Sequence, residues 1–396
     1  MSKTRLRIGY IPLVDAVTLV VAVDLGFADA EGLDVELVRE VSWSNVRDKL
    51  NIGLFDAAHL LSPVAIASSL GIGHVRVPLL APFNLGLNGN AITVSPRLFA
   101  SLSNRADGDI ADPAVSARAL ACEVAERKAG RGEPLTFGMT FPFSNHNYQL
   151  RFWMAAGGID PDDDVRLVVL PPPYMVESLA NGHVDGFCVG APWNSVAVES
   201  GVGRILHFGC EIVARASEKV LAVRERWAAD NPESLRALIR ALAHASSHVE
   251  DPANLAAVSA VVARRLDVSA DIVSSTLSGN LKIAPDGSAR SSNRYILIGR
   301  NGAARPDPVQ AAWLYAQMAR WGQTPISEEL SATARAVFRP ELYDAVLGIT
   351  PGRGHGEPTD GIGAFLGSAF DPSDIAGHLA AWSIKRAARP RLSVVR

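Results

Sequence analysis

Short apolar runs alternate with segments of helical length through residues 1–208, and this rhythm constrains the fold more than any other feature of the sequence. Strands that alternate with helices indicate βαβ units, whose parallel strands are covered by helices. From about Asn231 the pattern becomes mainly helical, interrupted by a loop at 284–308. The chain is therefore predicted to be an α/β protein with two mostly parallel sheets and helices on their faces. In such sheets, ligands bind beyond the carboxyl ends of the strands.

The segments can be placed individually. Strands are predicted at 6–11, 33–38, 57–61, 75–80, 91–94, 135–139, 165–170, 184–189 and 204–208. Helices are predicted at 17–27, after Ser42, after Ser62, and at 114–129, 146–156, 173–181 and 192–200. Residues 101–116 are predicted to form a loop, and the basic tail 383–396 to fray. These segments predict a discontinuous lobe 1, residues 1–95 plus 212–396, and a lobe 2, residues 96–211.

Composition narrows the class of protein. The net charge is −3 with both signs spread along the chain, which argues against direct nucleic-acid binding. No stretch is long and apolar enough to suggest a membrane span. The charged residues at the start lead directly into a strand, so no secretory signal is predicted and a cytoplasmic location is expected. Cys122, Cys188 and Cys210 are too far apart to suggest a disulfide framework or zinc spacing.

Two polar junctions in the first third have the chemistry of a binding site. Ser42 can cap a helix whose free N–H groups lie beside the indole of Trp43, and a helix start of this kind favours anions. Asn88 and Asn90 flank a glycine, which suits either a tight turn or a polar pocket wall. The structural alternative for the first junction is a capped helix with Trp43 in the core.

Three further junctions lie later in the chain. Ser144 can cap a helix with His146 in its first turn, where the dipole disfavours imidazolium but a neutral ring still donates one N–H. Gly190 allows close approach of the backbone, and Pro192 begins a helix. Lys219 would supply a positive charge, although Glu218 could face the pocket instead. The structural alternatives are a surface histidine, an ordinary turn and a solvated Glu–Lys pair.

Catalytic signatures are absent from the sequence. It lacks the nucleophile elbow, the phosphate-binding lysine loop and the zinc-binding His-Glu-x-x-His pattern. His59 in an apolar strand is interpreted as a core residue. The acidic run 160–164 lacks calcium-loop spacing and is interpreted as a solvated turn. We therefore predict a protein that is not an enzyme and has no metal or cofactor.

Several segments in combination resemble a known family. They are 25–37, 42–48, 56–63, 87–94, 141–147, 155–161, 190–194 and 317–322. Together they resemble the nitrate- and bicarbonate-binding proteins of cyanobacterial ABC transporters, whose fold is periplasmic-binding-protein-like and of the second structural class. They also resemble the NasS-type nitrate/nitrite sensor. The resemblance covers most of residues 5–325.

The resemblance implies a C-shaped pair of lobes with a small anion between them. It points to Trp43, Asn88, Asn90, His146, Gly190, Pro192 and Lys219 as ligand-binding residues. Transporter components of this kind carry a secretory or lipoprotein signal, and because none is predicted here a cytoplasmic nitrate/nitrite sensor is favoured. In that role the resemblance implies regulation of nitrate assimilation through an RNA-binding antiterminator of the NasT type, held without ligand and released when it binds. The alternatives are the binding component of a nitrate or bicarbonate transporter, and an enzyme, since relatives of this fold make the thiamine pyrimidine or act on small sulfur compounds.

Overall fold

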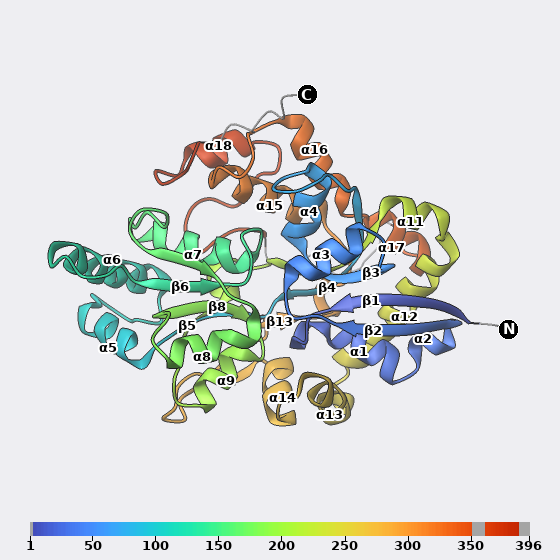
Figure 1. Ribbon diagram of the computed structural model, residues 1–396, viewed down its shortest axis with the longest axis horizontal. Helices are drawn as coiled ribbons and strands as arrows, with labels where there is room; N and C mark the ends of the chain where they lie inside the picture. Colours follow the sequence, from blue (N-terminus) through green and yellow to red (C-terminus); the bar gives the residue numbers. More distant parts are fainter. Residues whose placement is uncertain (1–2, 351–360, 388–396) are drawn as a thin grey trace.

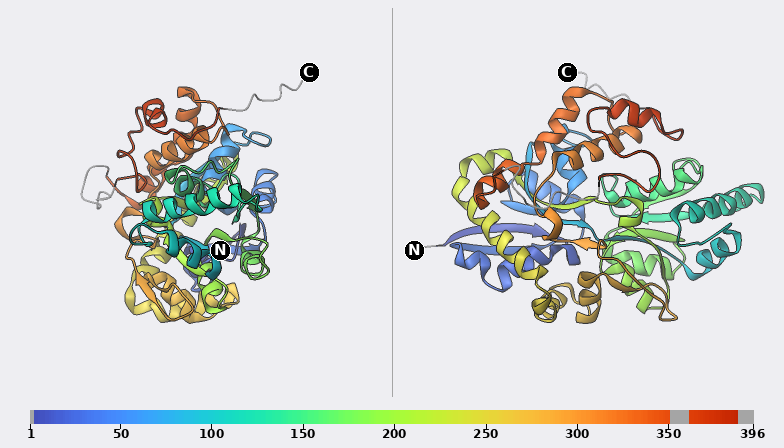
Figure 2. Two further views of the ribbon diagram at one scale, coloured as in Figure 1. Left: turned by 90° about the vertical axis from the view of Figure 1, so that its left-hand side faces the viewer. Right: turned by 180° about the vertical axis from the view of Figure 1, so that it is seen from behind.

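Two lobes lie side by side in the computed structural model (Figure 1), which describes residues 3–350 and 361–387. Each lobe is built on one sheet with helices packed against it, as the two further views also show (Figure 2). The predicted α/β, two-lobed architecture is therefore confirmed.

Lobe 1 contains a six-stranded sheet in the order β13-β4-β10-β3-β1-β2. Its strands are β1 (Thr4–Tyr10), β2 (Leu33–Arg39), β3 (Ala57–Leu61), β4 (Leu79–Asn88), β10 (Ser217–Arg224) and β13 (Ile296–Leu297). β1 runs parallel to β2 and β3, whereas β10 is antiparallel to both β3 and β4. β13 is antiparallel to β4.

Lobe 2 contains a five-stranded sheet in the order β7-β6-β8-β5-β9. Its strands are β5 (Asn90–Val94), β6 (Thr136–Met139), β7 (Arg166–Val169), β8 (Gly186–Gly190) and β9 (Arg204–Phe208). β6 is parallel to β7 and β8, and β5 is antiparallel to β8 and β9. The prediction of mostly parallel sheets is therefore wrong. Strands that enter a sheet from the other lobe, such as β5 and β10, run against their neighbours.

Helices cover the faces of both sheets. In lobe 1 they are α1 (Val17–Asp24), α2 (Phe27–Ala30), α3 (Trp43–Asn51), α4 (Ser62–Leu70), α11 (Glu225–Asp230), α12 (Pro232–Glu250), α13 (Leu255–Leu266) and α14 (Ala270–Ser278). In lobe 2 they are α5 (Pro96–Arg105), α6 (Pro113–Ala129), α7 (Asn145–Ala156), α8 (Met175–Ala180), α9 (Trp193–Glu199) and α10 (Gly209–Ile212). Three more helices lie above the two sheets in Figure 1: α15 (Pro308–Arg320), α16 (Glu328–Val337) and α18 (Ile375–Ala380). α17 (Pro340–Leu347) packs against β4 and α12 of lobe 1. Within residues 3–350 and 361–387, none of these helices has the length and hydropathy to cross a bilayer.

Asn88 holds together the segments that pass between the lobes. Its backbone is left-handed, with φ 61°, and Gly89 follows with φ 86° before β5 begins in the second sheet. The Asn88 amide donates to the carbonyls of Ala214 (3.1 Å) and Arg294 (2.9 Å), and its oxygen accepts the N–H of Ala216 (2.9 Å). Three stretches far apart in the sequence therefore meet at one buried side chain. The lobe boundaries at residues 95/96 and 211/212 stay a prediction, although β5 already lies in the sheet of lobe 2.

Four predicted segments differ from the observed ones. The helix at 17–27 is divided because Gly26 adopts φ 82° and ends α1 before α2 begins. The strand at 75–80 begins at Leu79 and continues to Asn88. The loop predicted at 101–116 is limited to 106–112, since α5 continues to Arg105 and Asp112 caps α6. The loop at 284–308 contains β13 and also β12 (Ala289–Ser291), which pairs with β11 (Asn280–Lys282).

Residues 361–387, which we call the C-terminal segment, bind lobe 2 to the helices above it. The ring centroids of Trp382 and Phe152, the latter in α7, are 4.9 Å apart. The Arg386 guanidinium pairs with carboxylates of the acidic run 160–164, and the Arg386 N–H donates to the carbonyl of Arg320 in α15.

These contacts bear on two predictions about this region. Residues 383–387 pack against the protein instead of fraying, while 388–396 lie outside the described residues. The acidic run 160–164 is a turn before β7 with Asp162 and Asp163 exposed, as predicted, but it is also held in place by ion pairs with Lys128, Arg151 and Arg386.

Candidate functional site

Five ionisable side chains form a continuous buried row between the lobes, and we call them the charge cluster. His59 Nε2 lies 3.0 Å from Asp15 Oδ1, and Asp15 Oδ2 lies 2.8 Å from Lys219 Nζ. Lys219 Nζ also contacts Glu218 Oε1 at 2.8 Å, and Glu218 Oε1 lies 3.5 Å from His146 Nε2. All five side chains are at most 2% exposed. One ammonium thus lies between two carboxylates, each of which faces an imidazole.

Both lobes contribute to the charge cluster. Asp15 lies in the 3₁₀ turn η1 (Val14–Ala16) after β1, and His59 lies in β3 of lobe 1. His146 lies in the first turn of α7 in lobe 2, where Ser144 caps the helix by accepting the N–H of Asn147. The cluster therefore crosses the boundary between the lobes at the contact of Glu218 with His146.

Glu218 and Lys219 are adjacent on β10, yet both reach the same cluster. Consecutive side chains on a regular strand point to opposite faces of the sheet. The pairing of β10 with β4 shifts in register between Ser217 and Lys219 and again between Lys219 and Val220. Such an irregularity re-aims side chains, which lets Glu218 and Lys219 both reach the charge cluster.

Burial and pairing determine the charge states in the cluster. Burial alone would lower the pKa of Lys219, but the carboxylates of Asp15 and Glu218 overcome it and raise that pKa. Burial opposes ionisation of both carboxyl groups, yet chiefly the Lys219 ammonium holds their pKa values below the usual range. Burial lowers the pKa of His59, and it lowers that of His146 to about 4. With both imidazoles neutral, two carboxylates and one ammonium leave one net negative charge.

Further polar side chains surround the cluster. Lys219 Nζ lies 5.3 Å from the centre of the Trp43 ring, a cation–π contact. Asn90 Nδ2 donates to Glu218 Oε2 at 2.8 Å and to Gln149 Oε1 at 3.3 Å. The Thr140 hydroxyl and His146 Nδ1 are 2.9 Å apart.

Several buried polar atoms here have no hydrogen-bond partner within residues 3–350 and 361–387. They are Trp43 Nε1, both ring nitrogens of His59, His146 Nε2, Asp15 Oδ1 and Asn90 Oδ1. The contact of His59 with Asp15 is short, but it does not meet the angles of a hydrogen bond. Because buried polar groups are nearly always hydrogen-bonded, so many at one place indicate a position that a ligand or water fills.

The structure brings most of the predicted site residues to this place. Trp43, Asn90, His146 and Lys219 lie in or against the charge cluster. Gly190 borders it, since a Cβ there would lie 3.5 Å from both Asn90 Oδ1 and an Asp15 carboxylate oxygen.

Asn88 and Pro192 are placed differently. The Asn88 amide is fully occupied by contacts with the main chain, and Pro192 follows a cis peptide bond and precedes α9. The structure thus assigns Asn88 to the connection between the lobes, whereas Asn90 faces the cluster.

Sequence reasoning missed Asp15 as a site residue and interpreted His59 as a core residue. Asp15 is a lone acidic residue among buried apolar neighbours, and that isolation was the available signal. A carboxylate in such a stretch must find a buried partner, because an unpaired buried charge is very costly. His59 is buried as predicted, yet its ring nitrogens belong to the site.

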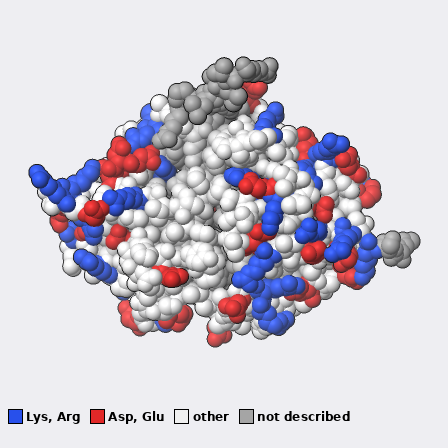
Figure 3. All heavy atoms as spheres, in the orientation of Figure 1, with Lys and Arg blue, Asp and Glu red and all other residues white. Residues whose placement is uncertain are grey.

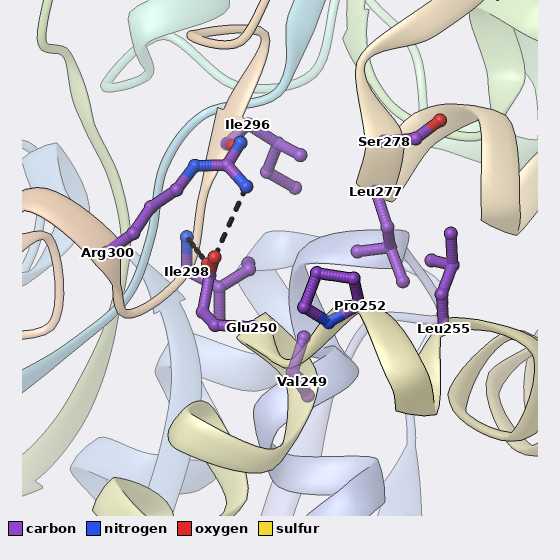
Figure 4. Close-up of a pocket in the computed structure, with 9 residues that line it drawn as sticks. All are labelled: Val249, Glu250, Pro252, Leu255, Leu277, Ser278, Ile296, Ile298 and Arg300. Atoms are coloured by element: carbon purple, nitrogen blue, oxygen red, sulfur yellow. Dashed lines mark hydrogen bonds and ion pairs between the residues drawn. The ribbon is translucent and has the colours of Figure 1, made fainter.

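A separate cavity of about 200 Å³ lies between α12, α14 and the segment around β13 (Figure 4). Its charged side chains are already paired, with Arg300 Nη1 3.2 Å from Glu250 Oε2. Glu250 Oε1 accepts the N–H groups of Ile298 and Gly299. The remaining walls are mainly apolar, so this cavity lacks the free donors of the charge cluster.

Two further observations concern the charges on the surface and groups that could hold a metal ion. On the face drawn in Figure 3, acidic and basic side chains are both spread over the surface. Among the residues that the structure describes, no group of three or more His, Cys, Asp or Glu side chains is arranged to hold a metal ion.

Similarity to known proteins extends over nearly the whole chain. The chain is 31% identical to the nitrate/nitrite binding protein NrtA of Synechococcus elongatus, covering 94% of this chain and 84% of that protein. It is 31% identical to the nitrate import ATP-binding protein NrtC of Synechocystis, but it spans only 56% of the length of that relative. The crystal structure of the periplasmic nitrate-binding protein NrtA from Synechocystis superposes with a TM-score of 0.85 at 25% identity, covering 96% of this chain and 99% of that one.

The family model for NMT1-like proteins matches residues 1–263, which include all strands of lobe 2, five of the six strands of lobe 1 and the whole charge cluster. With this match and the similarity to NrtA, the chain belongs to the NMT1-like family.

Proposed function

We propose that the charge cluster and Trp43 bind nitrate or nitrite, and that the chain works as a binding protein, not as an enzyme. The observation that carries the proposal is a pair of buried N–H donors, Trp43 Nε1 and His146 Nε2, that find no partner among the described residues and lie beside the Lys219 ammonium. Planar oxyanions accept hydrogen bonds at every oxygen, so they suit several converging donors. The names of the NrtA relatives support the same ligands.

Binding of this kind would close the two lobes upon each other. His146 belongs to lobe 2, whereas Trp43 and Lys219 belong to lobe 1. An anion that contacts all three has its full set of partners only when the lobes are together. It therefore favours the closed form by its differential affinity for the two states.

Nitrate and nitrite are expected to raise the melting temperature, and bicarbonate to raise it less. A ligand that binds only the folded state at 100 times its Kd stabilises that state by about 2.7 kcal/mol. Trp43→Phe keeps the ring over Lys219 but removes the indole N–H, so we expect it to weaken binding by about 1.5–3 kcal/mol. Thermal-shift assays and titration calorimetry measure the two effects.

Trp227→Phe makes the same change in α11, at a residue that does not belong to the charge cluster; it is the matched control and should leave anion affinity unchanged. Stabilisation by bicarbonate with calcium, together with no response to nitrate or nitrite, would show that the ligand assignment is wrong.

We further propose that the open form of the protein is bound by another protein in the cytoplasm, an RNA-binding antiterminator of the NasT type, which is released when the anion closes the lobes. This role as a nitrate/nitrite sensor rests on the family resemblance. The alternative is the binding component of an ABC importer, which the names of the relatives favour. Both roles need a partner that distinguishes open from closed lobes.

If the sensor proposal holds, an antiterminator of that type from the same cell should co-elute with the protein and separate from it when nitrate or nitrite is added. By linkage, the partner must weaken anion binding by the same factor by which the anion weakens partner binding. Size-exclusion chromatography and calorimetry with and without the partner test both halves. If the two proteins associate to the same extent with and without each anion, or do not associate, the importer role is favoured instead.

A further inference from the structure

We infer that the charge cluster takes up one proton on His146 together with each anion, so that the species held between the lobes is an anion plus a proton. This inference rests on the proposed anion binding at the same site. It assigns to His146 the role of a proton carrier in addition to that of a hydrogen-bond donor.

The charge count of the cluster makes the proton necessary. The carboxylates of Asp15 and Glu218 exceed the single ammonium of Lys219 by one charge, and all of these groups are buried. A monoanion would therefore add a second uncompensated negative charge to a site whose side chains are buried. Buried charges are tolerated only when they are paired, and groups that can change protonation state do so instead. One added proton restores the original balance.

His146 is the group best placed to carry that proton. Its Nδ1 already lies 2.9 Å from the Thr140 hydroxyl, so a neutral ring and a charged ring can both keep this contact. Its Nε2 has no hydrogen-bond partner in the part of the chain that the structure describes, and it lies 3.5 Å from Glu218 Oε1. In the imidazolium both nitrogens carry a proton, so Nδ1 donates to the Thr140 hydroxyl while the Nε2 N–H, now on a charged ring, points toward the carboxylate or the anion.

The proton would also bind the lobes to each other. Glu218 lies on β10 of lobe 1 and His146 on α7 of lobe 2, and Asn145 Nδ2 donates across the same boundary to the carbonyl of Ser217 at 2.6 Å. Protonation of His146 turns its contact with Glu218 from one between a neutral imidazole and a carboxylate into an ion pair. Anion binding, protonation of His146 and closure of the lobes therefore each favour the other two.

The groups that act on His146 determine the direction of the pH dependence. They are Glu218 and Lys219 from β10 and Asp15 from η1, with His59 of β3 behind Asp15. Without an anion, burial lowers the pKa of His146 to about 4, so the ring is neutral near neutral pH. A bound anion favours imidazolium and raises that pKa. Uptake then occurs between the free and the bound pKa values, and anion affinity falls as pH rises through that window.

Calorimetric titration with nitrate in buffers of different ionisation enthalpy measures the number of protons taken up. We expect about one proton per nitrate, and a Kd for nitrate that rises roughly tenfold per pH unit within the window. In His146→Gln, which keeps a side-chain amide donor, proton uptake should disappear and the Kd should lose its pH dependence. His183→Gln, at an exposed position of lobe 2, is the matched control and should behave as the parent protein.

The outcomes separate this inference from the proposed function. Nitrate binding without proton uptake in the parent protein overturns the inference and leaves the anion site standing. Undiminished uptake in His146→Gln, with circular dichroism showing an intact fold, overturns the assignment to His146. Absence of heat and of thermal shift with nitrate and nitrite at every pH contradicts the proposed function itself.

Discussion

Lys219→Met is expected to destabilise the protein by about 3–5 kcal/mol and to abolish measurable anion binding. The ammonium is the partner of both Asp15 and Glu218 at 2.8 Å, and all three side chains are buried. Removing it leaves two carboxylates facing each other without a cation between them. Urea denaturation measures the loss of stability, and calorimetry measures the loss of binding.

The pH dependence of this variant has a definite sign. In the parent protein, the lowered pKa values of Asp15 and Glu218 contribute stability that is present above their unfolded-state values and is lost as pH falls through the folded ones. In Lys219→Met, burial dominates and raises both pKa values. The carboxyls can then be buried without cost only when protonated, so the deficit relative to the parent should shrink as pH falls.

Lys282→Met provides the control for this experiment. Lys282 pairs with Glu199 at 3.2 Å, and both side chains are partly exposed, so the change should cost less than about 1 kcal/mol. If Lys219→Met were as stable as the parent at neutral pH, the assigned charge states of the cluster would be wrong.

Asn88→Ala is expected to destabilise the protein by about 3 kcal/mol or more, because it leaves buried main-chain groups without partners at about 1–3 kcal/mol each. These groups are the N–H of Ala216 and the carbonyls of Ala214 and Arg294, all of which are hydrogen-bonded to the Asn88 side-chain amide. The stabilising effect of the anion should persist, since no polar atom of this side chain is left for a ligand. Denaturation with and without saturating nitrate measures both quantities.

Two companion variants separate the causes. Asn88→Gly should be less destabilised than Asn88→Ala, because φ 61° suits glycine and costs an alanine about 1–2 kcal/mol. Asn90→Ala removes a side chain that contacts Glu218, and it should weaken anion binding. If Asn88→Ala lost affinity while Asn90→Ala kept it, the assignment of the two asparagines would be reversed.

Local patterns in the sequence predicted most of the elements and several site residues. Ser42 and Ser144 are observed as helix caps, and they place Trp43 and His146 in first turns, as expected from capping chemistry. β9 is observed at its predicted bounds, 204–208. These features depend on residues close together in the chain, which a pattern can report.

Long-range features could not be predicted in the same way. The antiparallel direction of β10 and the addition of β13 to the first sheet depend on where the chain crosses between lobes. Asp15 and His59 become part of the charge cluster only because the fold brings the turn after β1 and the strand β3 close to Lys219. The difference between Asn88 and Asn90 likewise depends on partners more than 50 residues away.

The C-terminal segment limits which movements are open to the two lobes. It holds Phe152 of α7 through Trp382, and Arg386 joins the carboxylates of 160–164 to the end of α15. A movement that separated α7 from α15 would have to break these contacts at once. Rotation of the lobes about an axis close to this segment would keep these contacts, so it is the easier movement. Small changes in the segment would then alter the resting angle between the lobes, and with it the affinity for anions, without touching any atom of the binding site.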